Sequence, residues 1–191
     1  MTGRFIAIVG PSGVGKDSVM EALTEADPRF TIARRVISRP VEKGGEVYDG
    51  VTEKAFAKAE QEGAFILNWA AHGLHYGIPK AVASDLALGR DVLVNLSRSV
   101  LPQAQTLFDR FCVILLTADR DVLAARLTAR NREDPAEIAR RLHRADFAMP
   151  TGVPYHSVDN SGPLIGTVEQ VGRYLSGSGF QPELPNQKIC I

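Results

Sequence analysis

A glycine-rich run that ends in a lysine, Gly10–Lys16, is the stretch of this sequence best suited to chemistry. It follows the apolar run Phe5–Val9 and precedes a stretch in which apolar residues recur at helical spacing. Glycines let backbone N–H groups point inward, a helix N-terminus adds positive potential, and a lysine at this position reaches the outer phosphates of a nucleotide. The pattern therefore predicts a loop that binds a nucleoside triphosphate. The alternative is a glycine-rich turn that only joins a strand to a helix.

Asp17 occupies the position after the lysine, where such loops usually carry a serine or threonine whose hydroxyl binds magnesium. A carboxylate beside phosphates is repelled by them unless a cation lies between. Asp17 is therefore either a magnesium ligand or an acid in the first helical turn that complements the helix dipole. We favour the magnesium ligand, with Ser18 as a helix residue without a metal role. The predicted nucleotide-binding residues of the loop are Gly10, Pro11, Ser12, Gly13, Val14, Gly15, Lys16, Asp17 and Ser18.

The elements that must position this loop alternate between strands and helices. Short, nearly continuous apolar runs predict buried parallel strands, and the intervening segments with helical spacing predict helices on both faces, as in a doubly wound α/β sheet. Between the first and second of these strands, a β-rich run at Thr31–Ile37 and a polar, aromatic turn at Ala71–Gly77 belong to an inserted segment. The predicted strands of the sheet are Phe5–Val9, Asp91–Leu96, Phe111–Leu116 and His156–Asn160, and the predicted helices include Glu53–Gln61, Lys80–Leu88 and a final helix through Leu175.

The composition of the 191-residue chain excludes several classes of function. Lysine plus arginine and aspartate plus glutamate number 22 each, so the net charge does not indicate nucleic acid or a membrane surface as partner. The two cysteines fit neither a disulfide framework nor a metal site, and Cys112 is expected in the core. No apolar stretch reaches the roughly 20 residues that a membrane helix needs. We therefore expect a cytoplasmic protein.

The order of the motifs resembles that of the guanylate kinase family of nucleoside monophosphate kinases. The matching motifs are G-P-S-G-x-G-K at Gly10–Lys16, Ser38-Arg39-Pro40 with Gly45-Glu46, G-L-H-Y-G at Gly73–Gly77, R-L-x-x-R-x-x-E at Arg126–Glu133 and I-x-x-R-L at Ile138–Leu142. The resemblance implies a P-loop NTPase fold of the guanylate kinase type, with a parallel sheet flanked by helices. It implies one domain over residues 1–175, a substrate-binding insert at about 34–80, an arginine-rich lid at about 126–144 and a flexible tail at 176–191.

The departures from the guanylate kinase pattern concern the acceptor. Guanylate kinases read the guanine edge with acidic residues, but the corresponding positions hold Asn68 and the run Asn95-Leu96-Ser97, followed by Arg98. An arginine and small hydroxyls suit a phosphorylated sugar better than a base. With the G-K-D-S loop, these departures resemble the ribose 1,5-bisphosphate phosphokinase family of phosphonate utilisation.

This second resemblance implies that ATP phosphorylates the 1-phosphate of the sugar, with Mg²⁺ as the metal cofactor. A guanylate or other nucleoside monophosphate kinase is the alternative enzyme. A non-catalytic guanylate-kinase-like binding module is the alternative of another class. A substrate panel and an ATP-binding measurement separate the three hypotheses.

The candidate residues outside the loop are cations and small polar groups. They are predicted to contact phosphates, the alternatives being solvated surface charges for the arginines and half-buried packing for Tyr76. Arg34 and Arg35 are left open, His72 and His75 are not assigned, and no general base is required because the attacking group is an ionised phosphate. The predicted catalytic residues are Lys16, Arg130 and Arg141; Arg126 is predicted to bind the nucleotide, and Arg39, Tyr76, Asn95, Ser97 and Arg98 to bind the acceptor.

Overall fold

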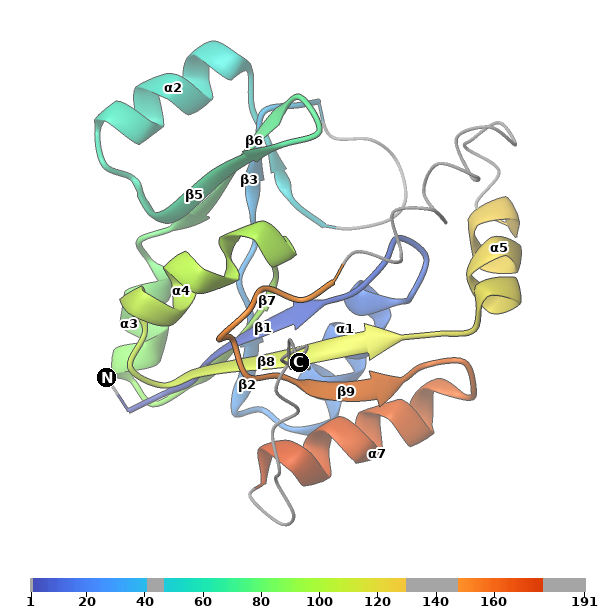
Figure 1. Cartoon of the computed structure of the whole chain (residues 1–191). Helices are drawn as coiled ribbons and strands as arrows, with labels where there is room; N and C mark the ends of the chain where they lie inside the picture. Colours follow the sequence, from blue (N-terminus) through green and yellow to red (C-terminus); the bar gives the residue numbers. More distant parts are fainter. Residues whose placement is uncertain (1, 41–46, 130–147, 177–191) are drawn as a thin grey trace, which may run out of the picture.

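A parallel sheet with the strand order β2-β7-β1-β8-β9 forms the centre of the molecule (Figure 1). In the computed structural model, which describes residues 2–40, 47–129 and 148–176, β1 (Phe5–Val9) lies between β7 (Asp91–Asn95) and β8 (Phe111–Thr117) and is parallel to both. Every residue of β1 is buried, as expected for a strand that is covered on both faces. The predicted α/β fold with helices flanking a parallel sheet is confirmed.

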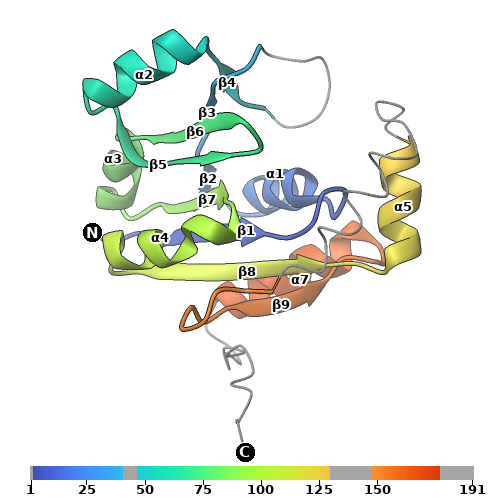
Figure 2. The ribbon, with the colours of Figure 1, turned by 45° about the horizontal axis from the view of Figure 1, so that its top comes forward.

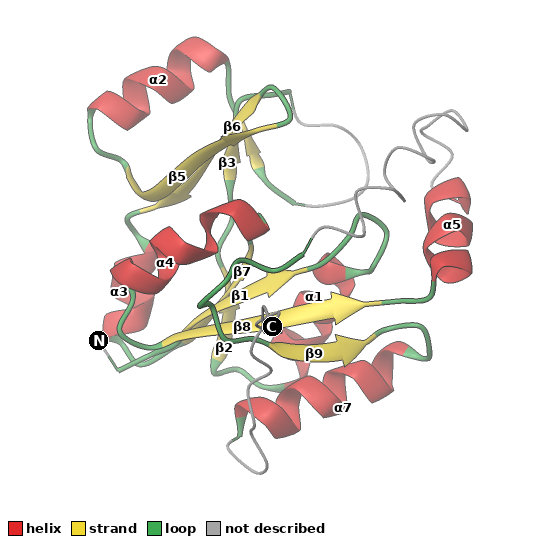
Figure 3. Cartoon of the chain, in the orientation of Figure 1, coloured by secondary structure: helices red, strands yellow, loops and turns green. Residues whose placement is uncertain are grey.

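The remaining helices and strands can be followed in Figure 3. They are α1 (Lys16–Ala26), β2 (Phe30–Ile32), β3 (Val36–Ile37), β4 (Asp49–Gly50), α2 (Glu53–Gln61), β5 (Phe65–Ala71), β6 (Leu74–Pro79), α3 (Val82–Ala87), the 3₁₀ turn η1 (Arg98–Val100), α4 (Leu101–Leu107), α5 (Arg120–Ala129), β9 (His156–Asp159) and α7 (Leu164–Leu175). Among the residues that the structure describes, no helix combines the length and the apolar character that crossing a membrane requires.

Two apolar cores lie on opposite faces of the parallel sheet. Phe5, Ala7 and Val9 belong to the core under α3 and α4. Ile6 and Ile8 belong to the core under α1 and α7. Successive side chains of a strand point to opposite faces, so the single run of β1 supplies both cores.

The chain between β2 and β7, which are neighbours in the parallel sheet, forms a second, mixed sheet with the order β4-β3-β6-β5. Figure 2 shows it as a layer of its own, with α2 on its far side. Phe56 of α2 is buried and stacks on Phe65 of β5, with 4.7 Å between the ring centroids. The aromatic contact and the Thr52 side chain, which accepts a hydrogen bond from the Ala55 backbone N–H, fix α2 against this sheet.

The inserted segment differs from the sequence-based expectation at two places. The β-rich run Thr31–Ile37 is two strands in different sheets, because β2 pairs with β7 whereas β3 pairs with β4 and β6. The predicted turn at Ala71–Gly77 is a hairpin whose turn is only His72-Gly73, with φ of 54° and 73°. Two residues with positive φ form the tight turn whose twist matches that of the flanking strands, so Tyr76 lies in a strand.

A partly buried ion pair closes the amino edge of the parallel sheet. The backbone N–H of Arg4 donates to Asp91 Oδ1 over 2.9 Å, and its guanidinium donates to the same carboxylate and to the Leu175 carbonyl at the end of α7. Burial alone would raise the pKa of Asp91, but the hydrogen bonds and the charge of Arg4 outweigh it and hold that pKa below its ordinary value. The pair therefore joins β1, β7 and α7.

We predict that Asp91→Asn lowers the free energy of unfolding by about 2–3 kcal/mol at pH 7, because a charge-assisted hydrogen bond is lost in a low-exposure site. Because the pKa of Asp91 is lower in the folded than in the unfolded protein, its charge stabilises the fold at pH values above the unfolded pKa of about 3.9. This stabilisation is lost as the pH falls through the pKa of the folded state. Urea unfolding at a series of pH values should show the two proteins converging in acid. Asp27→Asn, in the exposed pair with Arg29, is the control and should change stability much less. A constant difference across the pH series would contradict the prediction.

Candidate active site

The glycine-rich loop connects β1 to α1 at the carboxyl edge of the parallel sheet. Gly15 directly precedes α1 with φ of 93°, a conformation that residues with a side chain rarely adopt. A Cβ at Gly10 would lie 2.5 Å from the Leu116 carbonyl oxygen of β8. The two glycines therefore allow the loop to turn tightly into the helix and to lie against the neighbouring strand, leaving the N-terminus of α1 facing the loop.

Lys16 lies with its side chain folded over the loop. Its ammonium group donates to the carbonyl oxygens of Gly10 over 3.0 Å and of Pro11 over 3.1 Å. The cation is thus held at the same place as the N–H groups at the start of α1. A positive charge beside converging backbone donors is a site for phosphate oxygens.

Asp17 and Asn95 meet across the edge of the sheet. The Asn95 amide donates to Asp17 Oδ1 over 3.3 Å, and the parallel register places Asn95 beside Ile8. Asn95 is 8% exposed, and Asp17 is half-buried at the start of α1. The contact engages one carboxylate oxygen and leaves the second for another partner. One carboxylate together with substrate phosphates and water is a donor set that suits magnesium, so the residues present fit this metal.

The carboxyl end of β7 continues with further polar groups. The Ser97 hydroxyl is 2.9 Å from that of Ser99, and Arg98 begins η1. Burial lowers the pKa of the Arg98 guanidinium from its ordinary value, but arginine remains charged at neutral pH. The end of β7 therefore carries a neutral amide that contacts Asp17, followed by hydroxyl groups and a cation, at the edge where ligands of parallel sheets bind.

Arg39 is placed by an aromatic residue of the inserted segment. Its guanidinium lies over the ring of Tyr48, 4.6 Å from the ring centroid, and the Tyr48 hydroxyl donates to the Pro40 carbonyl over 2.7 Å. Among the residues that the structure describes, Arg39 Nε is buried and has no hydrogen-bond partner. The cation–π contact fixes the plane of the guanidinium, which presents its donors in a fixed direction.

Tyr76 belongs to a second arginine–aromatic stack. Its ring stacks on Trp69 with 5.2 Å between centroids, and the Arg35 guanidinium lies 5.4 Å from the Tyr76 centroid. Trp69 is accordingly half-buried in this stack. Arg35, which the sequence left open, is 9% exposed. Gly77 is necessary beside Tyr76 because a Cβ there would lie 2.6 Å from the Phe65 ring of the neighbouring strand.

The predicted site residues thus fall into two groups. One group lies at the carboxyl edge of the parallel sheet and consists of Lys16, Asp17, Asn95, Ser97 and Arg98. The other group, Arg39 and Tyr76, lies in the inserted segment. Arg126 of α5 reaches the loop, where its Nη1 donates to the Val14 carbonyl over 3.4 Å. Arg130 and Arg141 and the Gly45-Glu46 match lie outside the described residues, as do most of the predicted lid and tail.

Comparison with known proteins gives the family. No protein-family model matches the chain. It is 53% identical over 167 residues to a ribose 1,5-bisphosphate phosphokinase PhnN of Ruegeria sp. (strain TM1040), covering 87% of this chain and 88% of that protein. It is 46% identical over 181 residues to the PhnN of Pseudomonas fluorescens, covering 90% and 94%. The chain belongs to the ribose 1,5-bisphosphate phosphokinase family.

Other relatives place this family member in a wider context. A bifunctional ribose 1,5-bisphosphokinase-thymidine phosphorylase of Cupriavidus necator is 42% identical over 179 residues, which are 93% of this chain and 30% of that protein. Among solved structures, a guanylate kinase from Anaplasma phagocytophilum has a TM-score of 0.65 at 17% identity and covers 94% of this chain and 88% of its own. A gluconokinase from Sinorhizobium meliloti has a TM-score of 0.51 at 18% identity, with coverage of 94% and 99%. The predicted guanylate-kinase type of fold is confirmed.

Asn68 is the residue for which the guanylate kinase resemblance predicts a guanine-reading acid, and the structure shows what engages it. Its amide donates to the Glu60 carboxylate of α2. The side chain is therefore tied to the neighbouring helix. The carboxylate beside Asn68 is therefore that of Glu60 in α2, and it does not come from β5.

Sequence reasoning missed Asn160 as a residue of the site. It was expected only as the last residue of a strand, but its buried side chain contacts the loop at Val14. A polar residue at the carboxyl end of a parallel strand was the available signal.

Two other features of this family member lie apart from the loop. The Cys112 thiol is 3.4 Å from the Tyr174 hydroxyl, and burial raises the pKa of both groups, so the thiol stays protonated at neutral pH and is a poor nucleophile.

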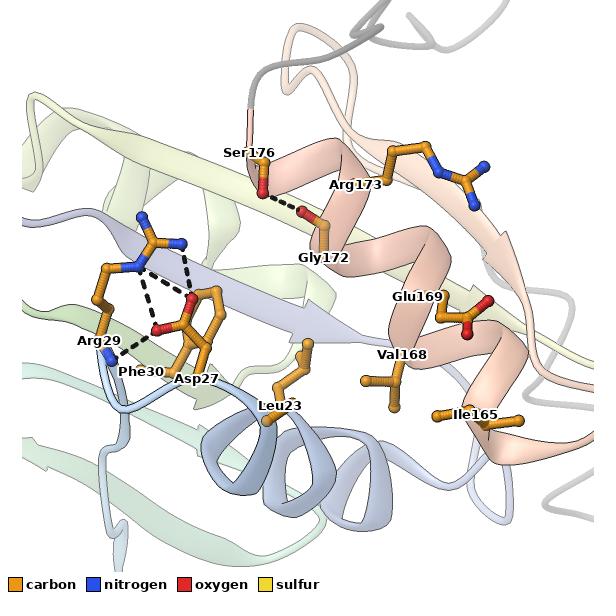
Figure 4. Close-up of a pocket in the computed structure, with 11 residues that line it drawn as sticks. Leu23, Asp27, Arg29, Phe30, Ile165, Val168, Glu169, Gly172, Arg173 and Ser176 are labelled. Carbon is orange, nitrogen blue, oxygen red and sulfur yellow. Dashed lines mark hydrogen bonds and ion pairs between the residues drawn. The ribbon is translucent and has the colours of Figure 1, made fainter.

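A groove between α1 and α7 has an apolar floor that includes Leu23, Phe30 and Val168 (Figure 4). It lies toward the C-terminal end of α1, whereas the loop precedes the N-terminus of that helix.

Proposed function

We propose that this chain transfers the terminal phosphoryl group of ATP to the 1-phosphate of ribose 1,5-bisphosphate, giving 5-phospho-α-D-ribosyl 1-diphosphate (PRPP) and ADP, in phosphonate utilisation. An oxygen of the 1-phosphate attacks the γ-phosphorus of ATP, and the bond from that phosphorus to the β,γ-bridging oxygen breaks. The attacking oxygen is already ionised, so the step needs no general base. The observation that carries the proposal is the end of β7, which presents the Asn95 amide, the Ser97 hydroxyl and Arg98, where the guanylate kinase pattern predicts base-reading acids.

The ATP side of the reaction is assigned to the glycine-rich loop. The backbone donors before α1 and the Lys16 ammonium would hold the β- and γ-phosphates, and positioning with charge stabilisation is the main source of rate in phosphoryl transfer. Arg126 would contact the nucleotide from the start of the lid. Arg130 and Arg141 would stabilise the transferring group, and this role stays a prediction from the sequence.

The acceptor side is assigned to the arginines at the end of β7 and in the inserted sheet. Ribose 1,5-bisphosphate carries two phosphates on a small ring, so it needs cationic donors at two places. The assignment of Arg98 to the reacting 1-phosphate is supported by its place just after the carboxyl end of β7, the strand whose Asn95 contacts Asp17. Arg39 is supported by its stacking on Tyr48, which suits the distal 5-phosphate, with Tyr76 as a hydroxyl donor.

Asp17 is assigned to magnesium. When bound there, the metal would supply positive charge that neutralises the charge developing on the phosphates during transfer. Asp17 would hold the metal directly or through water, and the Asn95 amide would orient the carboxylate through its hydrogen bond. The acid that such loops usually take from a neighbouring strand is thereby moved into the loop itself.

The first prediction concerns the acceptor. Phosphorus NMR of the protein with ATP and ribose 1,5-bisphosphate should show the new signals of a diphosphate group attached to the anomeric carbon. GMP should be turned over far more slowly. The reason is that the positions predicted to read guanine hold neutral amide and hydroxyl side chains, which lack the negative charge of a carboxylate acceptor. Turnover of GMP comparable with that of the sugar would favour a nucleoside monophosphate kinase that uses another acid, such as Glu60 beside Asn68. Absence of ATP binding would favour a non-catalytic module.

The second prediction concerns Arg39. Arg39→Lys should raise the KM for ribose 1,5-bisphosphate about tenfold or more, because a lysine keeps the charge but loses the planar fork that stacks on Tyr48. The KM for ATP should stay within about twofold, since the loop is unchanged. Arg34→Lys, in an exposed ion pair with Asp49, is the matched control. Equal effects on both KM values would show that Arg39 acts on the fold and not on the acceptor.

The third prediction concerns Asp17. Asp17→Asn should raise the magnesium concentration needed for half-maximal activity far more than it weakens ATP binding measured without metal, because the amide removes the charge that attracts the cation. Ser18→Ala should be mild in both measurements. An unaltered magnesium requirement in Asp17→Asn would mean that the carboxylate only complements the helix dipole.

A further inference from the structure

We infer that Asn160, supported by Thr167, is a positioning residue for the glycine-rich loop: it fixes the peptide between Val14 and Gly15 so that the loop presents its N–H groups to phosphates. This rests on the proposed use of ATP by the loop, but it does not depend on the identity of the acceptor. Asn160 follows β9 and Thr167 lies in α7, so both residues come from the C-terminal part of the chain.

Asn160 is the central residue of a short, buried series of hydrogen bonds. Its Nδ2 donates to the Val14 carbonyl oxygen over 2.7 Å, and its Oδ1 accepts from the Thr167 hydroxyl over 2.7 Å. Its own backbone N–H donates to the Thr117 carbonyl of β8 over 2.8 Å. Asn160 and Thr167 are each 3% exposed. The backbone N–H and both side-chain polar atoms of Asn160 are therefore engaged, and buried hydrogen bonds of this kind hold one geometry.

The geometry of a peptide bond turns this contact into control of the loop. A trans peptide is planar, so the carbonyl of Val14 and the N–H of Gly15 point in opposite directions. Fixing the carbonyl toward Asn160 directs the Gly15 N–H away from it. Gly15 has φ of 93°, and glycine rotates more easily than other residues, so an external contact is needed to select one orientation of this peptide.

Gly15 and Asn160 also fit each other sterically. A Cβ added at Gly15 would lie 2.8 Å from Asn160 Nδ2, closer than real Cβ contacts come. The glycine thus serves both the left-handed backbone and the approach of the amide. Because the Val14 carbonyl also accepts from Arg126 Nη1 over 3.4 Å, the same peptide is contacted by the C-terminal part of the chain and by α5.

The donors and acceptors in this series of hydrogen bonds suit an amide at position 160, although the Thr167 hydroxyl also lies 3.4 Å from the Asp159 carbonyl oxygen. A carbonyl oxygen only accepts and a threonine hydroxyl can donate, so the residue between Val14 and Thr167 must donate on one side and accept on the other. An ionised aspartate of the same shape accepts on both sides and would repel the Val14 carbonyl. Asn160→Asp therefore tests the donor, and Thr167→Val tests the supporting hydroxyl with little change of volume.

The experiment measures binding of a fluorescent ATP analogue and the separate KM values of ATP and the acceptor. Asn160→Asp should weaken nucleotide binding about tenfold or more, and Thr167→Val about threefold or more, since each removes a buried hydrogen bond that orients phosphate donors. The KM for the acceptor should stay within about twofold, and Thr167→Ser should restore nucleotide binding because it keeps the hydroxyl. Thr106→Val is the matched control, because it removes a hydroxyl that donates to the Gln103 carbonyl on α4.

The outcomes are distinguishable. Wild-type affinity for the analogue in a folded Asn160→Asp or in Thr167→Val would overturn the inference while leaving the proposed function intact. A lowered melting temperature with equal losses in both KM values would also overturn it, because that result describes a general structural role. Failure of the wild-type protein to bind the ATP analogue would instead contradict the proposed function. If Asn160→Asp does not fold, Thr167→Val and its rescue by Thr167→Ser decide the question.

Discussion

Parallel pairing of β1 with two neighbours is the constraint on which the rest of the molecule depends. Parallel strands end at the same edge of a sheet, so Val9, Asn95 and Thr117 bring their following loops together although they are far apart in the sequence. A strand buried on both faces cannot shift by one residue without exchanging its two cores. The register of β1 therefore sets which polar groups surround the glycine-rich loop.

The local pattern predicted β1, β7 and β8 well because each is a short, nearly continuous apolar run, whereas β2 was not separated from the inserted segment. Phe5–Val9 has the predicted bounds, and the others differ by a residue at an end. The inserted sheet was harder, because Val36–Ile37 and Asp49–Gly50 are two-residue strands, too short for any periodicity to appear. Their existence depends on pairing with β6 and with each other, which a single segment of sequence does not reveal.

The candidate site divides in the same way. The loop residues could be found because their spacing carries a mechanical requirement, and Asn95 could be found because it ends a strand. The contact of Asn95 with Asp17 joins residues 78 positions apart and the contact of Asn160 with Val14 joins residues 146 apart, so neither follows from local pattern. The stacking of Arg39 on Tyr48 also depends on how the inserted segment folds back on itself.

The hydrogen bond between Arg4 and the Leu175 carbonyl at the end of α7 bears on where a further domain could be joined to this one. It brings the start of β1 and the last turn of α7 to the amino edge of the sheet, opposite the edge that carries the glycine-rich loop. A polypeptide joined after α7 would leave the domain on the side remote from phosphoryl transfer. The relative from Cupriavidus necator, in which the matching region is 30% of a bifunctional protein, is an arrangement that such a geometry accommodates.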